Sequence, residues 1–219
     1  MKKVVLLSMV ISLFYSCTKE KEDQLSISTA TSYIPMDIGN YWVYEHYKID
    51  TLGNEILQSQ TDSVSISRQM TKRGHTYFVF QGTYFPIYSE FKSILWALRD
   101  SSGYLIDTNG RILFAENDFR DSLDIIYSQA KPNEDTIITY VFQMRTVQNF
   151  VNLSAGTFSA LNYHNLIYTH PTLNVPAGVP NPRSWNTYYS QGVGKILETY
   201  FYASQVDHNE RRLLKYNVK

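Results

Sequence analysis

The histidines are the side chains best suited to hold a metal ion or transfer a proton. A zinc site needs histidine, cysteine or carboxylate ligands at characteristic spacings. His164 and His170 are six residues apart, but neither a cysteine nor clustered carboxylates stand near them to complete a ligand set. We therefore predict no metal site and no cofactor. The side chains interpreted in this way as ordinary polar residues are His46, His75, His164, His170 and His208.

An acidic cluster is the second candidate for chemistry, because carboxylate oxygens bind Ca²⁺. It comprises Glu116, Asp118, Asp121 and Asp124. The spacing departs from that of the EF-hand loop, so the cluster is interpreted as a solvated face. No Gly-x-Ser-x-Gly elbow occurs in the sequence, and no catalytic residue is predicted. A glycosidase needs only two carboxylates across a cleft, which keeps a hydrolase open as the last alternative to a non-enzymatic protein.

Cys17 is the only cysteine of the chain, so no intramolecular disulfide can form. It follows two lysines, an apolar run over residues 4–15 and Ser16. This order is typical of a secretory signal, and about 12 apolar residues are too few for a transmembrane helix, which needs about 20. We expect residues 1–16 to be a signal peptide, cleaved between Ser16 and Cys17. The alternative is an ordinary signal peptide with an incidental cysteine.

The residues 13–17, Leu-Phe-Tyr-Ser-Cys, resemble the lipobox of bacterial lipoproteins. The resemblance implies a diacylglycerol on the Cys17 sulfur and, after cleavage, a further acyl chain such as palmitate on its amine. Acylation would explain a lone thiol in an exported protein. Two or three acyl chains would hold the protein on a bilayer essentially permanently, since each buried CH₂ contributes about 0.8 kcal/mol.

Residues 17–32 are polar and charged at first and then rich in Ser and Thr, so we expect a flexible tether there. Within it, Lys19, Glu20, Glu22 and Asp23 resemble the signal that sends Bacteroidota lipoproteins to the outer face of the outer membrane. The resemblance implies a lipid-anchored protein of the outer membrane that faces the cell surface. A periplasm-facing location remains the alternative.

Composition limits the class of the remaining chain, residues 33–219, which we expect to form a single β-rich domain. Loss of the two lysines of the signal would leave 18 basic and 20 acidic residues, a net charge of −2. This balance offers no basic surface for nucleic acid, so that class of partner is excluded. Aromatic residues make up 15% of the chain, which favours β structure. Most of these rings are expected to pack in a core, although tyrosine-rich faces also bind glycans and proteins.

Apolar and polar residues alternate along much of the chain, as in half-buried strands. In the first such run, Trp42, Tyr44 and His46 share one face. A short helix within residues 118–130 would place Leu123, Ile126 and Tyr127 on one face, and a proline-rich loop is expected over 171–182. Strands are expected over residues 41–51, 55–70, 76–85, 93–99, 104–107, 111–115, 136–150, 156–168, 187–202 and 211–218. The predicted fold is all-β, a single antiparallel, strongly curved sheet or partly open barrel with little helix.

Three phrases extend the resemblance beyond the signal. Residues 34–44 contain Pro-x-x-x-Gly-Asn-x-Trp-x-Tyr, residues 156–160 begin Gly-Thr-Phe, and residues 188–196 contain Tyr-Tyr-x-x-Gly-Val-Gly. Together they are similar to an uncharacterised family of Bacteroidota lipoproteins, which by analogy implies a curved half-barrel. We interpret the glycines of these phrases as sites of turns or close backbone approach; they are Gly39, Gly156, Gly192 and Gly194.

These observations favour a membrane-anchored, non-catalytic binding module of the cell envelope. Its first expected partner is the membrane that holds the anchor, and its candidate ligands are a glycan, a lipid or an envelope protein. Two other functions remain open. One is an envelope scaffold that binds protein through a sheet edge or the loop 171–182, and the other is a lipid carrier whose half-barrel has an apolar lining.

Overall fold

The computed structural model of the protein describes residues 30–219, apart from 85–91, 132–133, 148–149, 174 and 202–204. The predicted signal peptide, Ser16, Cys17 and the export signal at Lys19, Glu20, Glu22 and Asp23 therefore lie outside the described residues. No helix in the described part of the chain is both long enough and apolar enough to cross a membrane.

The described residues form one turn of helix, α1 (Ala30–Tyr33), followed by strands. The strands are β1 (Tyr41–Ile49), β2 (Glu55–Lys72), β3 (His75–Tyr84), β4 (Lys92–Ser101), β5 (Tyr104–Asp107), β6 (Ile112–Ala115), β7 (Asp124–Gln129), β8 (Thr136–Thr146), β9 (Val151–Leu153), β10 (Gly156–Phe158), β11 (Leu161–Thr169), β12 (Arg183–Ser190), β13 (Gly194–Tyr200) and β14 (His208–Asn217).

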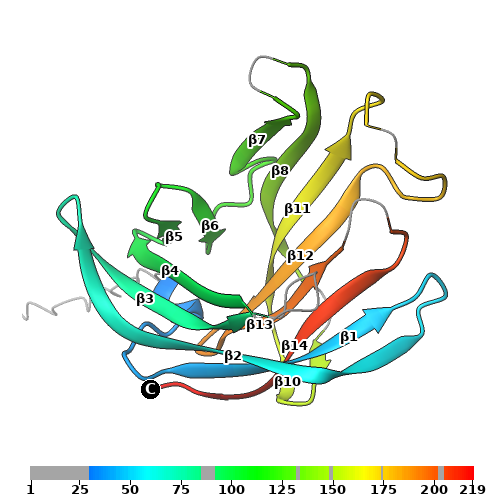
Figure 1. The fold of residues 1–219 in the computed structure, drawn as a ribbon. Helices are drawn as coiled ribbons and strands as arrows, with labels where there is room; N and C mark the ends of the chain where they lie inside the picture. The colour runs from blue at the N-terminus through cyan, green and yellow to red at the C-terminus, as the bar shows by residue number, and fades with distance from the viewer. Residues whose placement is uncertain (1–29, 85–91, 132–133, 148–149, 174, 202–204) are drawn as a thin grey trace, which may run out of the picture.

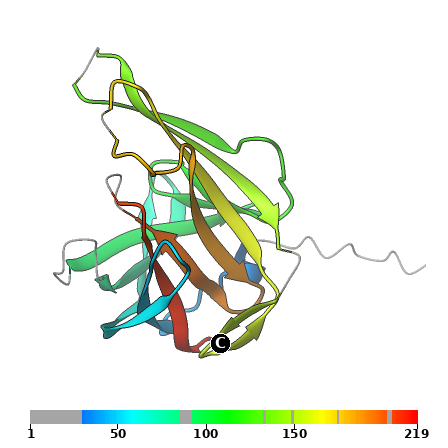
Figure 2. The same ribbon diagram turned by 90° about the vertical axis from the view of Figure 1, so that its right-hand side faces the viewer.

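Twelve of the strands form one antiparallel sheet in the order β6-β5-β4-β3-β2-β1-β14-β13-β12-β11-β8-β7, and β9 and β10 form a separate hairpin. The large sheet curls strongly on itself, as Figures 1 and 2 show. Its two edges approach each other without pairing. Near them the Tyr163 hydroxyl of β11 donates a hydrogen bond to the carbonyl oxygen of Ile112 in β6, over 2.8 Å. The predicted curved sheet or partly open barrel with little helix is confirmed.

The alternation predicted for the first strand is present in β1. Trp42, Tyr44 and His46 are buried on the concave face, while Tyr41 is exposed. The register shifts between Val43 and Tyr44 against β14, and again between Glu45 and Tyr47 against β2. Such bulges bend a strand and increase its twist, so they help β1 follow the curve of the sheet.

The short helix expected within residues 118–130 is wrong, because Asp124–Gln129 is the edge strand β7. Ile126 pairs with Tyr140 of β8, and the side chain of Ile126 lies on the concave face. Tyr127, its neighbour, is exposed on the opposite face. A strand is favoured because this period-two arrangement continues the concave surface of β8, which an isolated helical turn would not do.

Three predicted strands were too long. Residues 136–150 end as a strand at Thr146, residues 156–168 divide into β10 and β11, and residues 187–202 divide into β12 and β13. The last division falls at Gly192 and Gly194, whose φ angles are 71° and 105°. A Cβ at Gly194 would lie 3.1 Å from Nε1 of Trp42, so both a turn and a close approach occur here, as predicted. Positive φ angles at Gly39 and Gly156 agree with the same interpretation.

Order begins before residue 33, because α1 includes residues 30–32 of the segment expected to be a tether. The Ser32 carbonyl oxygen accepts a hydrogen bond from the amide of Gly192 over 2.6 Å. Tyr33 packs on Phe114 of β6 with ring centroids 5.1 Å apart, and Phe114 packs on Tyr189 of β12 at 4.9 Å. Phe114 thus joins α1, the β5–β6 hairpin and the inner wall of the sheet.

Candidate functional site

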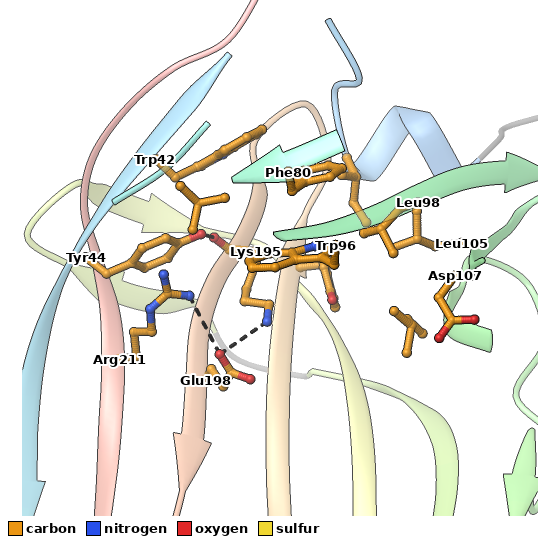
Figure 3. Close-up of a pocket in the computed structure, with 14 residues that line it drawn as sticks. Trp42, Tyr44, Phe80, Trp96, Leu98, Leu105, Asp107, Lys195, Glu198 and Arg211 are labelled. Atoms are coloured by element: carbon orange, nitrogen blue, oxygen red, sulfur yellow. Dashed lines mark hydrogen bonds and ion pairs between the residues drawn. The ribbon is translucent and has the colours of Figure 1, made fainter. Parts of the chain in front are cut away.

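The concave face of the sheet contains a cavity of about 360 Å³. Its lining is mostly aromatic and aliphatic and, apart from Ile34, comes from strands β1 to β6 and from β12 to β14 (Figure 3). The residues that line it are Ile34, Trp42, Tyr44, Val64, Phe80, Trp96, Leu98, Leu105, Asp107, Leu113, Tyr189, Lys195, Glu198 and Arg211. A volume of this size and an apolar lining with a few polar groups are typical of small-molecule sites, which span about 300–1,000 Å³.

Three aromatic rings form a ladder along one wall of this cavity. Phe80 and Trp96 are nearly parallel, with centroids 5.9 Å apart and planes at 3°, and Trp42 stacks on Phe80 at 6.1 Å and 24°. The Trp42 indole N–H donates a hydrogen bond to the Val193 carbonyl oxygen. Trp42 and Phe80 are buried, whereas Trp96 is only partly covered. The ladder therefore presents Trp96 as its accessible ring.

A second cavity, of about 390 Å³, adjoins the first. It lies between the β6 edge and strands β7, β8, β11 and β12, and it shares Leu113, Tyr189, Lys195 and Glu198 with the first cavity. Its other lining residues are Arg111, Ile126, Tyr140, Phe142, Tyr163, Asn165, Trp185 and Thr187. Because Leu113 belongs to β6, the β5–β6 hairpin supplies part of the boundary between the two cavities.

Charged side chains meet at the shared boundary. The Lys195 ammonium lies 3.2 Å from Glu198 Oε2, and Arg211 Nη1 lies 3.7 Å from the same oxygen (Figure 3). Behind them Arg211 donates two-pronged hydrogen bonds to Asp62, whose Oδ2 is also 2.7 Å from His46 Nε2. Asp62, His46 and Arg211 are all buried. The result is a network of charges that is buried at Asp62 and His46. It reaches the first cavity at Arg211 and both cavities at Lys195 and Glu198.

The surroundings of Asp62 and of the neighbouring Tyr44 shift the pKa of each. Burial alone would raise the pKa of Asp62, but hydrogen bonds from His46 and Arg211 outweigh it and hold that pKa below its ordinary value. Tyr44 lies under the Arg211 guanidinium, 3.7 Å from its ring centre, and donates its hydroxyl hydrogen to the Lys195 carbonyl oxygen over 2.9 Å. Burial raises the pKa of Tyr44, so its hydroxyl stays protonated and able to donate.

The other candidate residues of the sequence are scattered. His170 Nε2 lies 3.0 Å from the hydroxyl of Thr139, and His208 lies 3.8 Å from Glu210. In the acidic cluster, Asp118 forms an ion pair with Arg120 and accepts a hydrogen bond from the Tyr104 hydroxyl. Within the described ranges, no three His, Cys, Asp or Glu side chains gather in a way that could hold a metal ion.

His164 has a measurable consequence for stability. It is buried on the opposite face of β11 from the cavities, with its Nδ1 3.2 Å from the side-chain amide of Gln143. Burial, assisted by the charge of Arg145, lowers the pKa of His164 to about 4. Between the ordinary value of about 6.5 and about 4, the unfolded chain binds a proton that the folded chain does not, so stability falls as the pH falls through this window.

We expect this single group to lower the free energy of unfolding by about 1–2 kcal/mol between pH 7.5 and pH 5. Urea unfolding of the full chain at the two pH values measures the loss. The matched variant is His164→Gln, which cannot gain a proton and should lose correspondingly less stability on acidification. An equal loss in both chains would show that His164 does not cause the acid sensitivity.

An open antiparallel half-barrel with a lined interior is the class of structure that these elements define. Two solved structures are similar to it. One is a "putative exported protein with YmcC-like fold" from Bacteroides fragilis, with a TM-score of 0.47 and 14% identity, covering 83% of this chain and 96% of that one. The other is a "putative lipoprotein" from Parabacteroides distasonis, with a TM-score of 0.44 and 15% identity, covering 84% and 98%.

No protein-family model and no curated protein matches the chain at a significant level. Likeness at this level does not define what a protein does, and function has to be argued from the site.

Proposed function

We propose that the protein is a membrane-anchored lipoprotein of the cell envelope that binds a small molecule with an apolar body and does so without catalysis. The observation that carries the proposal is the aromatic cavity on the concave face, with Trp96 as its accessible ring. Apolar surface left open in a cavity gains free energy when a ligand covers it, by about 25 cal/mol per Å². The lipobox supplies the anchor for such a module.

The arrangement of the polar groups supports binding rather than catalysis. His46 and Asp62, the pair best suited to proton transfer, do not line either cavity. Lys195 and Glu198 do line both, but they are paired with each other. A catalytic acid or base must come within hydrogen-bond reach of the reacting group, so these partnerships suit a fixed wall better than a reactive centre.

Photo-crosslinking in the native envelope tests the proposal on the intact, anchored protein. The photoreactive residue benzoylphenylalanine would replace Trp96 in one strain and Leu95 in another. These positions are adjacent on β4, but Trp96 lines the cavity, whereas Leu95 is 64% exposed. After irradiation, the mass of the purified chain identifies any adduct.

The expected result is an adduct of small-molecule mass at position 96 and none at position 95. No adduct at position 96, or the same small-molecule adduct at both positions, would overturn the proposal. The benzoylphenylalanine side chain is larger than the indole it replaces, and Trp96 is the accessible end of the ladder, so the additional ring would extend into the cavity.

The proposed location is the outer membrane, with the domain facing the cell surface. The acidic tether with Lys19, Glu20, Glu22 and Asp23 supports this orientation, and a domain facing the periplasm is the alternative. An antibody raised against the domain distinguishes the two. It should label intact cells if the domain is displayed, and label only permeabilised cells if it is not.

An envelope scaffold is a second candidate, and the edge strand β7 favours it. Ile125 and Tyr127 are both exposed on the convex face of this strand, which has β8 as its single partner in the sheet. Exposed, apolar edge strands readily pair with other chains. Benzoylphenylalanine in place of Tyr127 would then give a protein adduct of defined mass, and its absence would remove the support for a scaffold.

A further inference from the structure

The second cavity contains a polar atom that needs a partner. Asn165 is 6% exposed and lines this cavity, yet none of the described residues hydrogen-bonds to its side-chain oxygen. A buried acceptor left unsatisfied destabilises a protein by about 1–3 kcal/mol. Because Oδ1 can only accept, the group that completes it has to donate a hydrogen, as a hydroxyl or an N–H does.

The charges around the second cavity are already balanced within the protein. Lys195 pairs with Glu198 at 3.2 Å, and Arg211 pairs with Asp62 and, at 3.7 Å, with Glu198. Arg111 reaches over the ring of Phe142, 4.4 Å from its centre. Its Nε lies 4.0 Å from Asp124, and no described residue accepts a hydrogen bond from it. A hydroxyl both donates and accepts, so it suits this N–H as well as the Asn165 oxygen. No cation therefore stands without an acid beside it among these three. An anionic head group would meet paired cations and an acceptor oxygen, and it would lose its hydration for little return.

Aromatic surface surrounds the unsatisfied oxygen. Tyr140 and Trp185 line the same cavity, and both are only partly buried. A ring face beside hydrogen-bonding groups suits a ligand that is apolar on one side and hydroxylated at its edge. A sugar or another polyol ring has this character, because its C–H faces pack on aromatic rings while its hydroxyls donate and accept.

In the first cavity the aromatic ladder, Leu98 and Leu105 form an apolar wall, and its charged lining residues are Asp107, Lys195, Glu198 and Arg211. The two cavities adjoin, with Leu113, Tyr189, Lys195 and Glu198 lining both, so a ligand that occupies both would lie across these four side chains. We propose that the ligand is a nonionic amphiphile whose hydroxylated head donates a hydrogen bond to Asn165 Oδ1 in the second cavity and whose apolar chain lies in the first. This inference rests on the proposed binding function and adds the class of ligand.

Two probes with the same chain and different heads test the inference. Octyl glucoside carries a neutral, hydroxylated head, and octyl sulfate carries an anionic head that cannot donate. All three tryptophans of the chain, Trp42, Trp96 and Trp185, line the two cavities. Tryptophan fluorescence of the full chain in nanodiscs, titrated with each probe below its micellar concentration, therefore reports binding. Empty nanodiscs give the correction for partition into lipid.

The expected result is at least about fivefold tighter binding of octyl glucoside than of octyl sulfate, the order of one hydrogen bond to a buried acceptor. In the variant Asn165→Leu this preference should fall to near one, while the affinity for octyl sulfate stays within twofold to threefold, roughly the scatter of unrelated substitutions. Unchanged binding of octyl sulfate also shows that the variant is folded.

The remaining outcomes separate the two proposals. If both probes bind the unmodified chain equally well, or if Asn165→Leu keeps the preference for the glucoside, the ligand class is wrong while the binding function stands. If octyl sulfate binds more tightly, the head group is anionic and the inference is overturned. If neither probe changes the fluorescence and no small-molecule adduct forms at position 96, the binding function itself fails.

Discussion

Replacement of Asp62 by asparagine should lower the free energy of unfolding by about 3–5 kcal/mol, which is the range observed when one partner of a buried ion pair is removed. The variant keeps the size of the side chain and loses its charge. Arg211, which is 2% exposed, would lose this carboxylate and keep the acidic neighbour Glu198 at 3.7 Å. His46 would lose the carboxylate oxygen that lies 2.7 Å from its Nε2.

A neighbouring ion pair provides a matched control. Arg212 follows Arg211 in β14 and makes the same two-pronged contact, at 2.7 Å for each prong, with Glu55 of β2. That pair faces outward, and the Glu55 side chain is 51% exposed. Glu55→Gln should therefore cost less than about 1 kcal/mol. Urea unfolding of both variants measures the difference, and similar losses in the two would show that burial does not determine the strength of the Asp62–Arg211 pair.

The same variant links stability to the site. Arg211 holds Tyr44 beneath it and lies beside Glu198, which in turn pairs with Lys195. Without Asp62, Arg211 is held less firmly, and Glu198 and Lys195, which contact it in turn, are less well positioned. The wall that the two cavities share is then less well ordered. Partial recovery of stability in Asp62→Asn combined with Arg211→Met would show that the uncompensated arginine, rather than the lost carboxylate volume, is the main cause.

The residues of the concave face in the first two strands can be predicted from the alternation of apolar and polar residues. Trp42, Tyr44 and His46 alternate with outward residues, and Val64 and Ile66 do so in the next strand. Asp62 has the same parity as Val64 and Ile66, so a buried carboxylate was a detectable signal. Its partner was not, because Arg211 stands 149 residues away and meets it only through the pairing of β1 with both β2 and β14.

The divisions between strands depend on turns that periodicity does not mark. The alternation runs through Tyr188 and Tyr189 toward Ile196, and it is the two glycines between them, interpreted from the sequence as sites of turns or close approach, at which the chain reverses. The cavities depend on curvature, which arises from bulges such as the one between Tyr188 and Tyr189. A bulge shifts register by one residue and has no fixed sequence signature, so neither Asn165 nor Lys195 could be assigned to a site from the sequence.

Phe114→Ala should lower the free energy of unfolding by about 3–5 kcal/mol, as expected for a fully buried phenylalanine. Phe114 is 0% exposed and touches Tyr33 of α1 and Tyr189 of β12. Truncation leaves a hole where three parts of the fold meet. Phe114→Leu keeps most of the volume and should cost roughly 1–2 kcal/mol. Phe119→Ala, at a position that is 46% exposed, should change stability by no more than about 0.5 kcal/mol.

The effect of Phe114→Ala should extend to ligand binding, because β6 contributes two features of the site. Its Leu113 lines both cavities, and the carbonyl oxygen of Ile112 accepts a hydrogen bond from the Tyr163 hydroxyl. Without the Phe114 ring the β5–β6 hairpin loses its main hold on the inner wall, and the boundary that positions both ends of an amphiphile loosens. Binding of octyl glucoside should weaken in Phe114→Ala under conditions where the variant is still folded, and remain unchanged in Phe119→Ala. A destabilised variant that binds as tightly as the unmodified chain would mean that the hairpin supports the fold but takes no part in the site.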